Sequence, residues 1–293
     1  MQKTMEIDAI LPTRLNAIAE APEPLRSAVS ENIPSESAIR LLVHAPAFST
    51  AAEKTPATVL AVTNEGWLVA TETEEGGATV EKSNFSETLF FELTSMLLFG
   101  QLKIYFATVG TAYFTAVRFD TVGEEYYLEA IDIMLRAIGP TKKDKAEKHW
   151  DTSSMLEAWP TTFRAEANRY LPKGQRLLAA IHWPAVAGGF QRELAPAGSL
   201  LVTEREAVVI SEEKISPRQH AGDIHKFGGI ITFFPSARLA DFHVSHHECS
   251  GVLTLQAHAM HGGEKLEITF PSDYETTVRA VMQKALVCAG SSI

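Results

Sequence analysis

Alternating apolar and polar positions near the end of the chain predict a strand, a turn, a second strand and a helix over Gly251–Leu286. The strands read GVLTLQAHA and EKLEITF, the turn reads MHGG, and the helix reads PSDYETTVRAVMQKAL. The same pattern occurs earlier, because Leu102–Leu135 aligns with Leu253–Leu286 at a constant shift of 151 positions. Gly100 then faces Gly251 without a gap. The pattern predicts that the chain contains two copies of one structural unit.

Short β-rich runs precede this closing pattern in both copies. In the first copy they are Arg40–Pro46, Thr58–Thr63, Trp67–Thr71, Ala78–Lys82 and Asn84–Leu93. In the second they are Arg176–Pro184, Ser199–Thr203, Ala207–Ser211, Ile230–Phe234 and Leu239–Ser245. A helix over Glu124–Ile138 closes the first copy, and helical segments lead into each copy within Met1–Asn32 and around Ser154–Arg169. We therefore expect a mainly β (α+β) fold with two barrels, each of about seven antiparallel strands closed by a C-terminal helix.

Three stretches of the second copy resemble the bacterial pleckstrin-homology-like (PH/GRAM-like) domains. They are the hairpin Gly198–Ile210, the proline-containing strand and turn Ile231–Val244, and the glycine-led strand Gly251–Leu255. The resemblance covers residues 40–138 and 176–288 and implies a PH-like fold with an adaptor-like role, since that family shares no catalytic residue. It gives a domain plan of a helical lead-in plus first domain over 1–140, a linker over 141–150, and a lead-in plus second domain over 151–293.

The net charge of −10 is carried by one half of the chain. Residues 1–140 hold 9 Lys and Arg against 19 Asp and Glu, whereas the remainder holds 17 of each. An acidic first half argues against binding to nucleic acid and to anionic lipid. A phosphoinositide site also needs basic residues on the opening hairpin, but the first copy has Asn64 and Glu65 there, and the second has Arg205 between two glutamates.

The cellular setting predicted from composition is cytoplasmic. Two cysteines are too few for a disulfide framework and suggest a reducing compartment. The first residues contain no apolar run typical of a signal peptide. The longest apolar region, Leu89–Val117, is interrupted by Glu92, Gln101 and Lys103, and its alternation favours paired strands. We expect a soluble protein without an integral membrane segment.

Histidine is the residue type that most suggests chemistry, and the densest cluster is His243, His246 and His247 with Cys249. On the predicted strand, His243 and His247 lie about 13 Å apart and His246 points to the other face. One metal ion, with ligand bonds of about 2.1 Å, cannot bridge them. We find no phosphate loop, GxSxG, HExxH or CxxC motif. The sequence predicts no metal site, no cofactor and no enzymatic activity.

Two segments remain as candidate sites. The second copy carries 11 extra residues within Glu212–Gly229, and this loop holds Arg218, His220, His225 and Lys226. The first copy has four apolar residues at a hairpin tip, Met96, Leu97, Leu98 and Phe99, where the second has His247-Glu248-Cys249-Ser250. We expect this tip to be buried, either between the two domains of one chain or between chains.

The leading hypothesis is a non-enzymatic interaction protein that binds a protein partner or itself. Two alternatives remain open. One is a protein that binds a small ligand or lipid headgroup at a barrel rim, and the other is an enzyme with its site in the 212–229 loop.

Overall fold

The computed structural model describes residues 11–33, 35–49, 54–139, 153–171, 174–187, 193–212, 228–247 and 249–290. The first copy contains β1 (Thr13–Arg14), α1 (Leu25–Asn32), β2 (Ile39–Ala45), β3 (Phe48–Ser49), β4 (Lys54–Thr55), β5 (Thr58–Thr63), β6 (Gly66–Glu72), β7 (Ala78–Asn84), β8 (Thr88–Met96), β9 (Phe99–Thr108), β10 (Thr111–Asp120) and α2 (Glu124–Ile138). The second contains α3 (Ser153–Leu156), α4 (Thr161–Tyr170), β11 (Leu177–Trp183), β12 (Val186–Ala187), β13 (Glu193–Ala195), β14 (Gly198–Thr203), β15 (Glu206–Glu212), β16 (Gly228–Pro235), β17 (Leu239–His247), β18 (Ser250–Ala259), β19 (Gly262–Pro271) and α5 (Glu275–Gly290). The fold is mainly β, with antiparallel sheets and a C-terminal helix.

The predicted duplication of three strands and a helix is confirmed. β8, β9 and β10 begin and end 151 positions before β17, β18 and β19, and α2 begins 151 positions before α5. One glycine in each copy helps to fix this register. Gly100 faces Phe119 across the β9–β10 pair, and Gly251 faces Phe270 across the β18–β19 pair. A Cβ atom would lie 2.3 Å from the Phe119 ring or 2.5 Å from the Phe270 ring, so the close ring needs a glycine opposite it.

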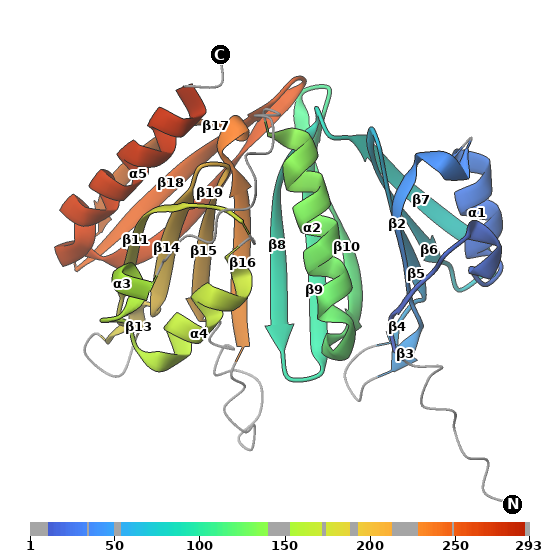
Figure 1. The fold of residues 1–293 in the computed structure, drawn as a ribbon, viewed down its shortest axis with the longest axis horizontal. Coiled ribbons are helices and arrows are strands. Elements are labelled where there is room, and N and C mark those ends of the chain that lie inside the picture. Colours follow the sequence, from blue (N-terminus) through green and yellow to red (C-terminus); the bar gives the residue numbers. More distant parts are fainter. Residues whose placement is uncertain are drawn as a thin grey trace, which may run out of the picture.

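The two copies are joined by a shared sheet, which corrects the expectation of two closed barrels. The central sheet has seven strands in the order β10-β9-β8-β16-β15-β14-β11, so β8 of the first copy pairs with β16 of the second (Figure 1). The order β1-β2-β5-β6-β7 makes a second sheet and β17-β18-β19 a third, and none of the described sheets closes into a barrel. The physical reason is a strand with two apolar faces: Phe233 and Phe234 of β16 are both buried, on opposite sides of the sheet.

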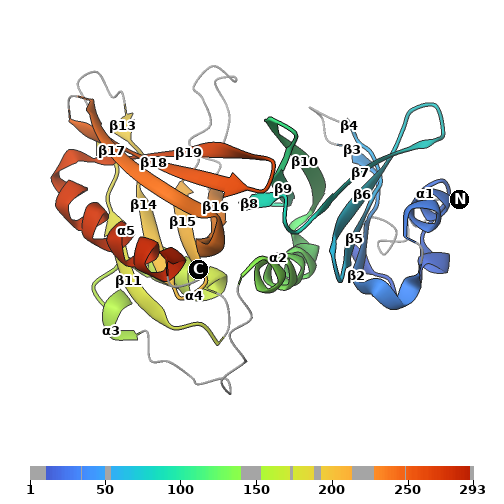
Figure 2. The same ribbon diagram turned by 90° about the horizontal axis from the view of Figure 1, so that it is seen from above.

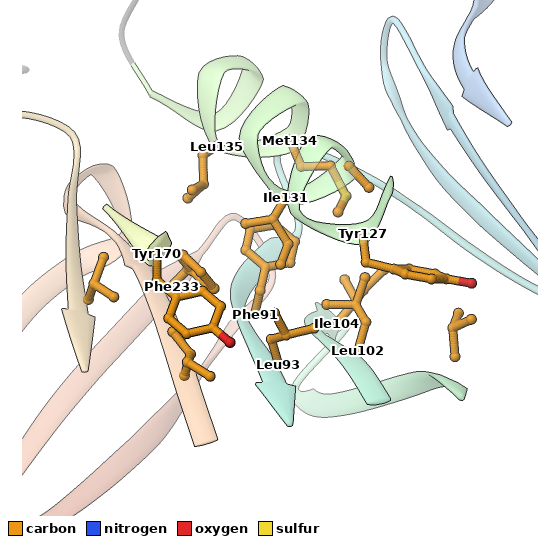
Figure 3. Packing of buried hydrophobic residues seen from close by; sticks show 14 of the residues in the cluster. Phe91, Leu93, Leu102, Ile104, Tyr127, Ile131, Met134, Leu135, Tyr170 and Phe233 are labelled. Atoms are coloured by element: carbon orange, nitrogen blue, oxygen red, sulfur yellow. The ribbon is translucent and has the colours of Figure 1, made fainter. Parts of the chain in front are cut away.

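Each face of the central sheet has its own core. On one face, α2 packs over β8 and β9, with Tyr170 of α4 and Phe233 of β16 beside it (Figure 3). On the other face, β17, β18, β19 and α5 cover the sheet, as the view from above shows (Figure 2). A separate small core lies between α1 and the outer face of the β2-β5-β6-β7 strands. Residues of both copies contribute to both large cores.

One predicted strand is wrong at its start. The run Asn84–Leu93 is divided, because Asn84 ends β7 and β8 begins at Thr88. The Thr88 hydroxyl donates to the Asn84 carbonyl and accepts from the Trp67 indole at 2.9 Å, so it stabilises a turn at this point. The apolar region Leu89–Val117 lies within β8, β9 and β10. Within the described ranges, no helix has the length and apolar character needed to cross a membrane.

Candidate functional site

The predicted apolar hairpin tip lies between β8 and β9. β8 ends at Met96 and β9 begins at Phe99, so Leu97 and Leu98 form a two-residue turn. Their side chains are 72% and 69% exposed, whereas Met96 and Phe99 are partly buried. The described residues of the second copy therefore leave both leucines largely uncovered. Both copies pack against α2, which lies beside the sheet and does not extend over its end. A contact between chains stays a prediction.

The tip is held in place by the segment that follows β10. The Thr121 hydroxyl donates to the Leu97 carbonyl at 2.5 Å, and the Thr121 amide donates to the Leu98 carbonyl at 3.3 Å. Val122, the next residue, is 63% exposed and extends the apolar surface. We call Leu97, Leu98 and Val122 the apolar tip. The carbonyls of Leu97 and Leu98 are held by Thr121, while the side chains of the tip face solvent.

Leu97 also has an uncommon backbone conformation. Its φ is +51°, and Leu97 is the one residue other than glycine with positive φ in the described parts of the chain. This region favours glycine and asparagine, because a Cβ atom there clashes with the backbone at a cost of about 1–2 kcal/mol. A leucine here combines backbone strain with an exposed apolar side chain, so neither folding nor solubility explains the choice of residue.

The remaining candidate residues lie in the 212–229 loop and on β17. Arg218, His220, His225 and Lys226 lie outside the described residues. Of the cluster on the predicted strand, His243 and His246 lie on β17 as expected, and His246 Nε2 contacts a carboxylate oxygen of Glu275 at the start of α5. In the described part of the chain, no group of three His, Cys, Asp or Glu residues is placed to hold a metal ion.

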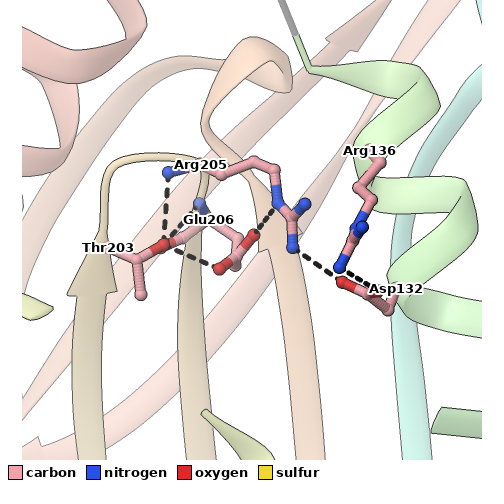
Figure 4. Close-up of polar contacts among 5 residues, drawn as sticks. All are labelled: Asp132, Arg136, Thr203, Arg205 and Glu206. Atoms are coloured by element: carbon pink, nitrogen blue, oxygen red, sulfur yellow. Dashed lines mark hydrogen bonds and ion pairs between the residues drawn. The ribbon is translucent and has the colours of Figure 1, made fainter. Parts of the chain in front are cut away.

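Sequence reasoning missed a polar network where the two copies meet (Figure 4). Glu206 is fully buried and accepts hydrogen bonds from the Thr203 hydroxyl at 2.7 Å and from Arg205 Nε at 2.8 Å. Arg205 also donates to Asp132 of α2 at 2.9 Å, and Arg136 pairs with the same carboxylate. Burial alone would lower the pKa of Arg205, but Glu206 and then Asp132 outweigh it and raise the pKa. The sequence signal, a Glu-Arg-Glu turn, is typical of a solvated hairpin and gave no indication of burial.

A second network joins α2 to α4. Glu124 is buried and accepts hydrogen bonds from the Ser95 hydroxyl at 2.7 Å and from the Tyr170 hydroxyl at 3.0 Å. It also forms an ion pair with Arg169 at 3.0 Å. Burial, followed by the nearby Glu124 carboxylate, raises the pKa of the Tyr170 phenol, which therefore stays a donor. Both networks have the character of structural joints, because their charged groups are satisfied by one another.

No protein-family model matches the chain, and no curated protein matches it.

Proposed function

We propose that this is a non-enzymatic interaction protein, built from two pleckstrin-homology-like units, that binds a protein partner through the apolar tip. The observation that carries the proposal is the pair of adjacent leucines, 72% and 69% exposed, at a turn where one of them is strained. Exposed apolar side chains and a strained backbone conformation are both unfavourable in an isolated molecule, so their occurrence together indicates a contact surface. The buried carboxylates of the molecule support this reading, because their described partners are hydrogen-bond donors within the fold.

The small-ligand alternative gains little support from the polar cavity beside the first strands. A cavity of about 190 Å³ lies beside β1 and β2 and is lined by Arg14, Asn16, Glu36 and Arg40 among others. Sites for small molecules usually measure about 300–1,000 Å³. Arg14 is also engaged by Glu129 of α2 at 3.0 Å, so its charge is already neutralised.

Site-specific photo-crosslinking tests the proposal. A photoreactive amino acid is placed at position 98 in cells that make the protein, and the matched control carries it at position 260. Met260 is 74% exposed at the tip of a different hairpin, so the two probes are about equally accessible. We expect a defined adduct at position 98 that is absent from position 260. The same adducts at both positions, or none at position 98, would refute a docking role for the tip.

A stability measurement gives an independent check. Leu97→Asn should raise the free energy of unfolding by about 1 kcal/mol, because asparagine tolerates positive φ. The same substitution should abolish the position-98 adduct. An improved fold with lost binding separates a functional leucine from a structural one. A destabilised Leu97→Asn variant would show that the side chain supports the fold instead.

A further inference from the structure

The second copy has an exposed apolar feature that the first copy lacks. A groove of about 400 Å³ lies between β11 and α5 and is lined by Leu178, Gln283, Lys284, Val287 and Cys288. Val287 is 68% exposed, and the Leu178 side chain forms the facing wall. We call this the α5–β11 groove. The groove is open to solvent, and its lining is mostly apolar.

The groove and the apolar tip are each specific to one copy. In the first copy, the strand register places Arg40 at the position of Leu178, and the shift of 151 places Arg136 at the position of Val287. In the second copy, the positions equivalent to Leu97 and Leu98 are Glu248 and Cys249. The last three strands of each copy coincide at a shift of 151 positions, and the closing helices begin at the same shift. Departures from a repeat that add exposed apolar surface point to function, because the repeat alone does not require them.

Charge favours contact between unlike halves of two molecules. Residues 1–140 carry the whole net charge of −10, and the remainder is neutral. A symmetric contact of tip against tip would bring two acidic halves together, and exposed Glu125 follows Val122 of the tip three residues later. A contact of tip against groove places the acidic half of one molecule on the neutral half of another. Lys284 lines this groove, and its ammonium donates to the Leu178 carbonyl at 3.2 Å.

We propose that the apolar tip of one molecule docks in the α5–β11 groove of another, so that molecules associate head to tail. This inference rests on the proposed function and names its partner as a second molecule of the same chain. Such a contact is heterologous, and it produces a ring if the rotation closes and an open chain if it does not. The Leu97 and Leu98 side chains fill the groove, and Val287 and Leu178 form its walls.

Mixing two single-defect variants tests this arrangement. Leu98→Asp removes the tip and leaves the groove, whereas Val287→Asp removes the groove and leaves the tip. By light scattering coupled to size exclusion, the native protein should associate with concentration and each variant alone should be monomeric, its affinity reduced about tenfold or more. An equimolar mixture should form dimers and nothing larger, because one intact tip and one intact groove remain. Met260→Asp is the control and should associate like the native protein.

Disulfide trapping avoids dependence on the folding of the aspartate variants. In a Cys249→Ser background, Leu98→Cys should form an intermolecular disulfide with the native Cys288 under mild oxidation. Met260→Cys in the same background is the control and should not. Peptide mapping of a 98–288 disulfide would support the inference. A monomeric native protein, or trapping no faster at position 98 than at 260, would overturn it.

The two proposals fail in different ways. A position-98 photo-adduct that maps to another protein would overturn head-to-tail association and leave the docking role of the tip intact. A position-98 adduct within residues 178–184 or 283–288 of the same chain supports both. The absence of any adduct overturns the proposed function and this inference together.

Discussion

β7 and β16 occupy the same place in the two copies but have opposite surroundings. β16 pairs with β15 and with β8, and it lies inside the central sheet. β7 pairs with β6 alone among the described strands and forms a sheet edge. Phe233 of β16, which is buried, is replaced in β7 by Lys82, which is exposed and donates to Asn32 of α1. A charged residue on an edge strand disfavours pairing with a further strand. A strand with aromatic residues on both faces, in contrast, is stable only inside a covered sheet.

The closing helices show the same contrast. α2 lies between the first copy and α4 of the second, and its Leu128 and Ile133 are partly buried against the core. The equivalent residues of α5 are Arg279 and Lys284. Arg279 donates to the Val244 carbonyl of β17 at 3.1 Å, in the strand that has no partner equivalent to β16. The two copies therefore share one order of strands and helix, and a few side chains determine the different packing partners of each copy.

Substitution of Phe233 should lower the free energy of unfolding more than the other substitutions below. A small loss would contradict the contrast between β16 and β7. Phe233→Ala should lower the free energy of unfolding by about 3–5 kcal/mol, because it leaves a cavity beneath α2 at the joint of the copies. Lys82→Ala, the equivalent change on the edge strand, should alter it by less than about 0.5 kcal/mol. Urea unfolding monitored by circular dichroism measures both. Similar losses in the two variants would show that β7 and β16 are energetically alike.

Substitution of the first glutamate of each closing helix should give an intermediate effect. Glu124→Ala leaves the buried Tyr170 hydroxyl and the partly buried Ser95 hydroxyl without their acceptor, which should cost about 1–3 kcal/mol. Glu275, the equivalent residue, is bonded by Arg279 at 2.7 Å near the surface, and Glu275→Ala should cost less. The same urea titrations compare the two variants. A larger loss for Glu275→Ala would show that the junction network is dispensable.

The local part of this contrast could be predicted from the sequence. Strand and helix bounds follow from alternation and from apolar spacing, so the bounds of α2 and the tip at Leu97–Leu98 are as predicted. The pairing of β8 with β16 was missed, because a strand edge leaves no periodic signal. A hint was available in the run Ile230–Phe234, which is apolar except for Thr232 and is typical of a strand buried on both faces. The run Ala78–Lys82 alternates between apolar and polar residues and carries no such signal.

The candidate sites were predictable only where a residue departs from its repeat partner. Leu97 and Leu98 were found in this way. Their exposure could not be predicted, because it depends on how the two copies join in three dimensions. Burial of Glu206 depends on α2 of the other copy in the same way. The domain plan and the PH-like resemblance stay predictions, and the shared sheet crosses the predicted boundary.

The smallest effect concerns a histidine that both copies share. His44 of β2 and His182 of β11 are equivalent, and burial lowers the pKa of each below its usual value. Protonation therefore favours the unfolded chain, so the stability that these neutral rings contribute is present above about pH 6.5 and declines as the pH falls below it. His182→Gln should flatten the dependence of the urea midpoint on pH between about 7.5 and 5.5. His243→Gln, at an exposed position, is the matched control, and an equal flattening there would contradict the assignment.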